Sequence, residues 1–207
     1  RAAASIQHPN IAVIHGAEQW DGTPLLVFEY VEGGTLARRI REGPIPPEKV
    51  VGCGTAIASA LVAAHAAGVL HRDIKPSNIG FTASGVPKLL DFGLARLLHD
   101  PRRDVPSGIH DPPAPDSETT EAPLTRSNVV VGTVAYVSPE AVHGDPPSPA
   151  LDLWALGVTL YEAITGANPF LELSAPDTMH AIVERPVPNA RIRRPDCPDA
   201  LAAFLSR

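Results

Sequence analysis

Two stretches of the sequence decide how this chain folds and what it can do: residues 71–78, which read HRDIKPSN, and residues 88–93, which read KLLDFG. The polar groups that they carry are Asp73, Lys75, Asn78 and Asp91. A carboxylate can accept a proton from a hydroxyl, and amide and carboxylate oxygens are ligands that Mg²⁺ prefers. With a lysine beside them, these groups form the charge inventory of phosphoryl transfer from a magnesium nucleotide.

A hairpin is predicted near the start of the chain, where apolar runs at residues 11–14 and 25–30 flank the turn-forming residues 21–24. Two further short strands are predicted at residues 79–82 and 87–90. The polar groups therefore lie on loops next to small strands, which is where functional groups are usually displayed.

Apolar residues at helical spacing predict that most of the remaining structure is helical. Residues 150–165 are apolar almost all round, so we expect a helix that is buried on most faces, with Ser148 as its cap and Pro149 at its start. Residues 99–128 are rich in proline and lack periodicity, so a long mobile loop is expected there. The other helices are predicted at residues 35–41, 46–67, 176–184 and 198–205.

The composition favours a globular domain, since the chain has 207 residues of which 44% are hydrophobic. The net charge of −6 gives no support to nucleic acid as a partner. Cys53 and Cys197 have no metal-binding spacing and are interpreted as packing thiols in a reducing compartment. No apolar run is judged long enough to span a bilayer, so we expect a cytoplasmic chain without a membrane segment, although a longer parent protein can be anchored elsewhere.

Several short blocks, taken in order, resemble the C-terminal lobe of a protein kinase, most closely that of the eukaryotic-type (Hanks-type) bacterial serine/threonine kinases. One block alone carries little weight, but their order and sensible gaps make the set specific, and the resemblance covers nearly the whole chain. The blocks are HPNI at 8–11, VFEYVEGGTL at 27–36, HRDIKPSN at 71–78, DFG at 91–93, GTVAYVSPE at 132–140 and DLW at 152–154.

The resemblance implies an α+β, protein-kinase-like fold with a mainly α-helical C-lobe and a remnant N-lobe hairpin. Residues 1–30 would be the remnant of the N-lobe, made of the end of the regulatory helix and two strands. Residues 31–207 would be the C-lobe, truncated at its C-terminus. Within it, residues 71–78 would form the catalytic loop and residues 91–140 the activation segment.

The resemblance also implies a role for each polar group. Asp73 would orient the substrate hydroxyl and accept its proton, while Lys75 would lie beside the transferring phosphate of ATP. Asn78 and Asp91 would hold Mg²⁺. Thr133 would bridge Asp73 and Lys75 through its hydroxyl. A lysine at position 75 is typical of serine/threonine specificity, so a protein substrate with serine or threonine hydroxyls is the expected partner.

The hinge of the resembled family receives the adenine of ATP, and here the Glu29 carbonyl and the Val31 amide would be its partners. Gly80 departs from the family, which usually has a larger apolar residue under the adenine ring. Phe81 is taken as the residue that compensates.

Other residues at family positions are expected to support the catalytic loop. His65 and Asp152 would brace it from beneath, and His71 would pack under it. Arg72 would pair with a phosphate on the activation segment, at Thr125 or Ser127. The alternative, that these are ordinary linker hydroxyls, stays open. The candidate phosphoacceptors are Thr119, Thr120, Thr125 and Ser127.

One part of the family's nucleotide site has no match. The lysine that holds the nucleotide phosphates should precede the hinge, whereas Lys49, Lys75 and Lys88 all follow it. Residues 51–57, VGCGTAI, only faintly resemble a glycine-rich loop and are better explained as helix. We therefore expect these residues alone to bind ATP weakly, with little phosphoryl transfer, and to need the missing N-lobe of a parent chain as partner.

Two other functions stay open. A catalytically inactive kinase-like scaffold or interaction module would explain the missing lysine, but it has no need of the four polar groups quoted first. A small-molecule phosphotransferase of the same fold usually lacks the long segment that ends in GTVAYVSPE.

Overall fold

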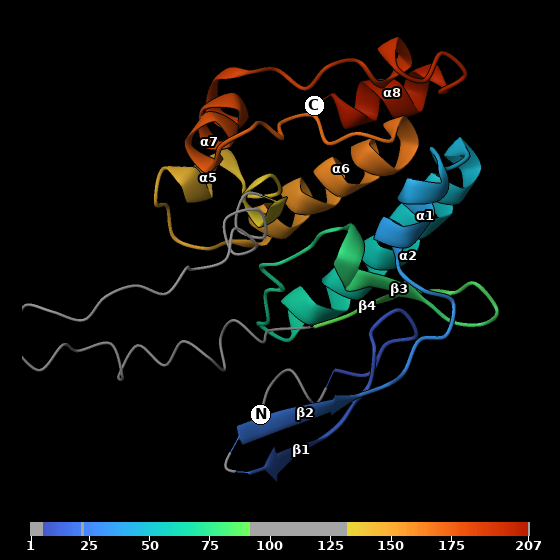
Figure 1. The fold of residues 1–207 in the computed structure, drawn as a ribbon, viewed down its shortest axis with the longest axis vertical. Coiled ribbons are helices and arrows are strands. Elements are labelled where there is room, and N and C mark those ends of the chain that lie inside the picture. Colours follow the sequence, from blue (N-terminus) through green and yellow to red (C-terminus); the bar gives the residue numbers. More distant parts are fainter. Residues whose placement is uncertain (1–5, 22, 92–131, 207) are drawn as a thin grey trace, which may run out of the picture.

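The computed structural model describes residues 6–21, 23–91 and 132–206 (Figure 1). The predicted α+β class is confirmed, because helices form most of the described structure and two small antiparallel hairpins accompany them. The elements are β1 (Ile14–Trp20), β2 (Thr23–Phe28), α1 (Leu36–Glu42), α2 (Pro47–Ala66), β3 (Ile79–Phe81), β4 (Pro87–Leu89), α5 (Pro139–Val142), α6 (Pro149–Thr165), α7 (Ala175–Glu184) and α8 (Asp199–Leu205), with short 3-10 turns at Pro76–Asn78 and Ala190–Ile192.

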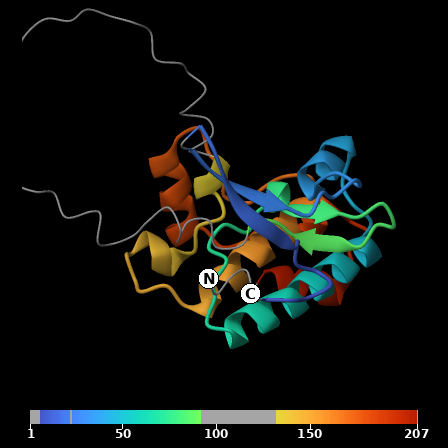
Figure 2. The same cartoon turned by 90° about the horizontal axis from the view of Figure 1, so that it is seen from below.

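The β1–β2 hairpin lies at one end of the molecule, and α5, α7 and α8 lie at the other (Figure 1). The β3–β4 hairpin lies between them, next to α2, as the turned view also shows (Figure 2). The stretch that joins β3 to the end of α2 is the predicted catalytic loop. This loop therefore runs between the small hairpins and the helical body.

The core forms where α2 packs against α6. Ile57 and Leu61 of α2 and Ile164 of α6 are almost wholly buried in the same cluster. A side chain at Gly54 would place its Cβ 2.8 Å from Cδ1 of Leu160, so this glycine permits the close approach of the two helices. Gly52 and Gly54 are thus both helical, as predicted, and Gly54 serves the packing of α2 against α6.

By length and composition alone, α2 is apolar enough to cross a membrane, which corrects the expectation that no run in this chain is long enough. Its buried residues include Val50, Ile57 and Ala64, and the helix contacts α6 and β4. Core helices meet the same criteria of length and apolarity. Packing inside the domain therefore accounts for the apolar residues on the buried side of α2.

The helix ends follow the sequence signals in most places. Thr35 caps α1 by accepting a hydrogen bond from the Arg38 amide at 3.3 Å, and Gly166 ends α6 with a φ of 77°. The prediction for Ser148 is only partly right. It occupies the cap position of α6, but its side chain makes no capping hydrogen bond. The Leu151 amide donates instead to the Ser148 carbonyl at 3.2 Å.

The first predicted strand was placed too early. β1 begins at Ile14, whereas Ile11 and Ala12 lie beside β4, where the Ala12 amide donates to the Leu89 carbonyl at 2.9 Å. Both residues are buried. The apolar run at residues 11–14 therefore reflects burial against β4 as well as pairing in the hairpin.

Several predictions concern residues outside the described part of the chain. They are the long loop at residues 99–128, Gly93, and the candidate phosphoacceptors Thr119, Thr120, Thr125 and Ser127. The structure therefore does not test these predictions.

Candidate active site

The backbone of the predicted catalytic loop is held by one buried carboxylate, Asp152 of α6. Its Oδ2 accepts a hydrogen bond from the His71 amide at 2.9 Å, and its Oδ1 accepts one from the Arg72 amide at 2.8 Å. Nε2 of His65, on α2, lies 2.8 Å from Oδ2. Arg72 has a φ of 68°, a conformation that non-glycine residues rarely adopt, and these bonds hold it there. His65 and Asp152 thus make the bracing contacts expected of them.

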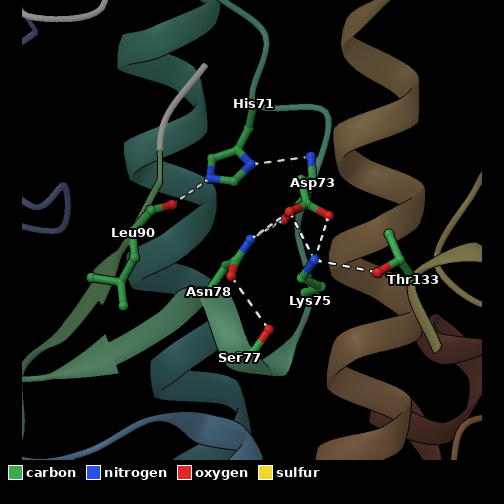
Figure 3. Close-up of polar contacts among 7 residues, drawn as sticks. All are labelled: His71, Asp73, Lys75, Ser77, Asn78, Leu90 and Thr133. Carbon is green, nitrogen blue, oxygen red and sulfur yellow. Dashed lines mark hydrogen bonds and ion pairs between the residues drawn. The ribbon is translucent and has the colours of Figure 1, made fainter. Parts of the chain in front are cut away.

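His71 packs under the loop, as expected, and is only 1% exposed. Burial lowers its pKa below the ordinary value, against the nearby charges of Asp152, Asp73 and Asp91, so the ring is neutral. Its Nε2 donates to the Leu90 carbonyl at 2.7 Å, and its Nδ1 accepts from the Asp73 amide at 3.2 Å (Figure 3). Because a carbonyl only accepts and an amide N–H only donates, these partners fix the tautomer. The ring thereby joins the catalytic loop to the end of β4.

Asp73, Lys75 and Asn78 are in direct contact (Figure 3). Nζ of Lys75 lies 2.9 Å from Oδ1 and 2.8 Å from Oδ2 of Asp73. The Asn78 amide group donates to Oδ2 of Asp73 at 2.9 Å and to the Asp73 carbonyl at 2.8 Å. The Asp73 carboxylate is thus held by donors on two sides, which fixes its orientation.

Of the two contacts expected for the Thr133 hydroxyl, the one to Lys75 is present and the one to Asp73 is not seen among the described residues. Oγ1 of Thr133 accepts a long hydrogen bond of 3.5 Å from Nζ of Lys75. Among the described contacts it has none to Asp73, whose two carboxylate oxygens are already engaged by Lys75 and Asn78. The structure therefore links Thr133 to Asp73 only through the lysine.

Asp91 is placed beside this group by the backbone. The Leu90 amide donates to the Asn78 carbonyl at 2.8 Å, so Asp91 follows directly after a contact with Asn78. Asp91 has a φ of 55°, which marks a sharp change of chain direction. Side-chain contacts thus join four of the predicted site residues: Asp73, Lys75, Asn78 and Thr133. Asp91 lies near them because the preceding residue, Leu90, is hydrogen-bonded to the Asn78 carbonyl.

The oxygen groups of Asn78 and Asp91 suit a hard divalent cation. The Asn78 side chain turns its N–H donors toward Asp73, which leaves its Oδ1 with a hydroxyl contact of 3.3 Å from Ser77. No described residue forms a hydrogen bond or ion pair with the Asp91 carboxylate. Two oxygen donors are few, but Mg²⁺ commonly keeps several waters and binds substrate phosphates. The residues present therefore fit the ion that the sequence predicts.

A cavity of about 320 Å³ opens beside this group. Its lining includes Asp73, Arg72, Thr133 and Tyr136. A group that enters this cavity therefore lies next to Asp73.

The hinge holds an ion pair that sequence reasoning missed. Nζ of Lys88, on β4, donates to Oε2 of Glu29 at 2.8 Å, and the Val13 amide donates to the same oxygen at 3.1 Å. Burial opposes ionisation of Glu29, but these two hydrogen bonds outweigh it and lower its pKa below the usual range. No pattern marks this pair, because the residues lie far apart in the sequence and single charged residues are usually solvated.

Replacing Lys88 by methionine is expected to lower the free energy of unfolding by about 1–2 kcal/mol at pH 7, because Glu29 then loses its charged partner. A carboxyl whose folded-state pKa is depressed contributes stability above its unfolded pKa, about 4.3, and loses it as the pH falls through the folded value. The difference between Lys88→Met and wild type should therefore shrink as the pH falls below about 4. Denaturant unfolding across this range measures it.

Lys49 offers the matched control, since it is an exposed lysine for which no ion pair is described. Lys49→Met should change the unfolding free energy by less than about 0.5 kcal/mol at every pH. A difference between Lys88→Met and wild type that stays constant with pH would contradict the assignment of the pair.

The expectation for Phe81 is wrong. Gly80 and Phe81 are neighbours in β3, so they face opposite sides of the strand. Phe81 is buried in the core with the Arg39 guanidinium 3.4 Å from its ring centroid. On the Gly80 side, an added Cβ would lie 2.6 Å from Cγ2 of Val31 and 3.1 Å from Cδ1 of Leu90, so these side chains fill the space instead. The adenine roles of Glu29 and Val31 stay predictions.

Comparison with known proteins identifies a family. The protein kinase domain family matches residues 1–205 of this chain. The chain is 35% identical to serine/threonine-protein kinase PknH of Mycobacterium bovis, over 100% of its own length and 31% of the relative's. It is 35% identical to serine/threonine-protein kinase PknL of Mycobacterium tuberculosis, over 92% of its own length and 43% of the relative's.

A third relative comes from another genus. The chain is 32% identical to the probable serine/threonine-protein kinase PknB of Lactococcus lactis, over 97% of its own length and 29% of the relative's. The chain thus spans less than half the length of these relatives.

Proposed function

Because this chain belongs to the protein kinase domain family, we propose that it forms part of an enzyme that transfers the γ-phosphoryl group of ATP to serine and threonine hydroxyls of protein substrates. The similar proteins are named serine/threonine-protein kinases, which supports this class of acceptor. The activity, the substrate and the cofactors of the whole protein are part of the proposal.

The observation that carries the proposal is the Asp73 carboxylate, held by Lys75 and Asn78 and facing a cavity. In this arrangement Asp73 accepts a hydrogen bond from the acceptor hydroxyl, aligns its oxygen for in-line attack and takes its proton. Lys75 supplies a positive charge next to the transferred phosphoryl group. The oxygen that attacks and the charge that stabilises the transition state are thus positioned by neighbouring side chains.

ATP and Mg²⁺ are the proposed cofactors. Oδ1 of Asn78 and the carboxylate of Asp91 would hold the ion, which neutralises phosphate charge when bound. The Glu29 carbonyl and the Val31 amide would hold the adenine. Because no lysine precedes the hinge within these residues, we propose that the 207 residues on their own bind ATP weakly. The use of ATP also favours a cytoplasmic location.

Metal removal tests this function. The full-length gene product, incubated with γ-labelled ATP, Mg²⁺ and a generic protein substrate, is expected to label serine and threonine. Excess EDTA should abolish the label, and added Mg²⁺ should restore it, because the phosphates need the ion for neutralisation. Phosphoamino-acid analysis measures the acceptor.

The outcomes separate the candidate functions. Label on tyrosine alone would reject the serine/threonine assignment. A folded gene product that gives no metal-dependent label on any substrate would favour the inactive scaffold. Transfer to a small molecule but to no protein would favour the third candidate.

A further inference from the structure

A second cavity lies between α1, α2, the β3–β4 hairpin and α6. Its volume is about 690 Å³, which lies within the size range of sites for small organic ligands. Helix α1 contacts β3 and α6, while α2 contacts β4 and α6 (Figure 1). None of residues 71–78 lines the cavity, so it is separate from the catalytic loop.

Most of the cavity wall is apolar. Leu36 and Phe81 are buried residues of this wall, and Leu160 of α6 is another. Cys53 of α2 also lines the cavity, and burial raises the pKa of its thiol to about 11, so this group is neutral at pH 7. A wall of this kind favours the apolar part of a ligand.

Two cations accompany this apolar wall. Arg39 is half-buried, with its guanidinium 3.4 Å from the Phe81 ring centroid, and Lys49 is exposed near the start of α2. Within the described residues, neither cation belongs to an ion pair. The acid in the lining, Glu42, lies 3.5 Å from a different arginine, Arg38. The excess charge at the cavity is therefore positive.

The rim of the cavity favours a small molecule over an extended peptide. A peptide that adds as a strand needs free backbone groups along an edge. The amides of Gly43 and Ile45 already donate to carbonyls of the chain, at 3.0 and 2.8 Å. Other rim residues are prolines and have no N–H: Pro44, Pro46 and Pro87. These rim residues therefore offer no N–H donor to a peptide backbone.

We propose that this cavity binds a small carboxylate that has an apolar body. The carboxylate pairs with the Arg39 guanidinium, whose planar N–H groups match two carboxylate oxygens, and Lys49 adds a second positive charge. The apolar body lies against the wall that includes Leu36, Cys53 and Leu160. This site goes beyond the proposed function, because it needs neither ATP nor the catalytic loop.

Isothermal titration calorimetry of the full-length gene product tests the site. Phenylbutanoate is the charged probe, and phenylbutanamide is its neutral counterpart. The carboxylate is expected to bind with a Kd of about 1 mM or below, and the amide about tenfold more weakly, because only the carboxylate forms a charged pair. Saturating ATP and Mg²⁺ should leave this binding unchanged, since the catalytic loop does not line the cavity.

One variant tests the charge. Arg39→Met keeps an unbranched side chain and removes the guanidinium, so it should weaken the binding of phenylbutanoate about tenfold and leave that of phenylbutanamide unchanged. Arg41→Met is the matched control. It removes an exposed arginine of the same helix that does not line the cavity, and it should change the affinity for neither probe.

A second variant tests the cavity itself. Gly52 lines the cavity from α2, and a Cβ added there would have no atom within 4 Å. Gly52→Leu is therefore compatible with the helix, in which leucine is preferred to glycine, and it should abolish the binding of phenylbutanoate by filling space. Gly52→Ala is the matched control, since it adds only a methyl group and should retain the affinity within about threefold.

The outcomes decide the proposal. Equal affinities for the two probes would overturn it, as would Arg39→Met or Gly52→Leu proteins that bind phenylbutanoate as tightly as wild type. An acidic peptide, acetyl-Leu-Glu-Leu-amide, presents the same carboxylate on a peptide backbone. Binding of this peptide without binding of phenylbutanoate would reject the small-molecule site.

Thermal midpoints show whether the variants are folded. If Arg39→Met does not fold, the comparison of the two probes on the wild-type protein and the Gly52→Leu variant still decide. None of these measurements depends on phosphoryl transfer, so the proposed function can fail while this site stands, and the reverse.

Discussion

Asp73→Asn in the full-length gene product is expected to lower kcat for phosphoryl transfer about a thousandfold, the usual contribution of a positioned general base. Asparagine has nearly the same shape, and its carbonyl oxygen can still accept from the Asn78 amide. It cannot take the proton of the acceptor hydroxyl, and it leaves Lys75 without a carboxylate partner. The loss should therefore fall on the chemical step rather than on folding.

Steady-state phosphotransfer with purified proteins measures this effect, together with the thermal midpoint of each variant. Asp21→Asn provides the control. Asp21 lies in the β1–β2 turn with a φ of 47°, a conformation that asparagine adopts as readily as aspartate. Its kcat should equal that of wild type. Equal activity of Asp73→Asn and wild type would remove Asp73 from the role of base.

Asp152→Asn is expected to lower the free energy of unfolding by about 3–5 kcal/mol, because it breaks a buried charged network. Asp152 is 0% exposed and accepts from the amides of His71 and Arg72 and from the ring of His65. An asparagine must turn its own N–H₂ group toward at least one of these donors, so that donor loses its acceptor.

The thermal midpoint of this variant should fall by about 6–20 °C, given about 2–4 °C per kcal/mol for a domain of this size. Asp145→Asn, at an exposed position, should shift the midpoint by less than about 2 °C. Calorimetry or circular dichroism measures both. An Asp152→Asn protein as stable as wild type would show that the carboxylate does not hold the loop.

The parts of this structure that could be predicted depend on local signals. The spacing of apolar residues and the flanking proline and glycine predicted residues 46–67 as a helix, and α2 spans Pro47–Ala66. Asp73, Lys75 and Asn78 lie within six positions of one another, so their convergence follows from a short loop. Thr133 was found only through the family resemblance, since nothing local connects it to Lys75.

The parts that could not be predicted depend on contacts between distant segments. Lys88 and Glu29 lie 59 positions apart, and only the folded chain brings their side chains together. The predicted side-chain cap at Ser148 is not formed, because the Leu151 amide donates to the Ser148 backbone carbonyl instead of to its hydroxyl. The error at Phe81 was avoidable, because strand alternation alone places residues 80 and 81 on opposite faces.

Because the amides of residues 71 and 72 donate to Asp152, we expect these residues not to unfold separately from α6. Their amide protons are bonded to a side chain in the middle of α6, so they become accessible to deuterium only when that helix separates from its neighbours. Exchange at these two amides should therefore be as slow as in the core of α2, although the segment has no regular secondary structure. The amides of a surface catalytic loop would then be protected from exchange as strongly as those of the buried core.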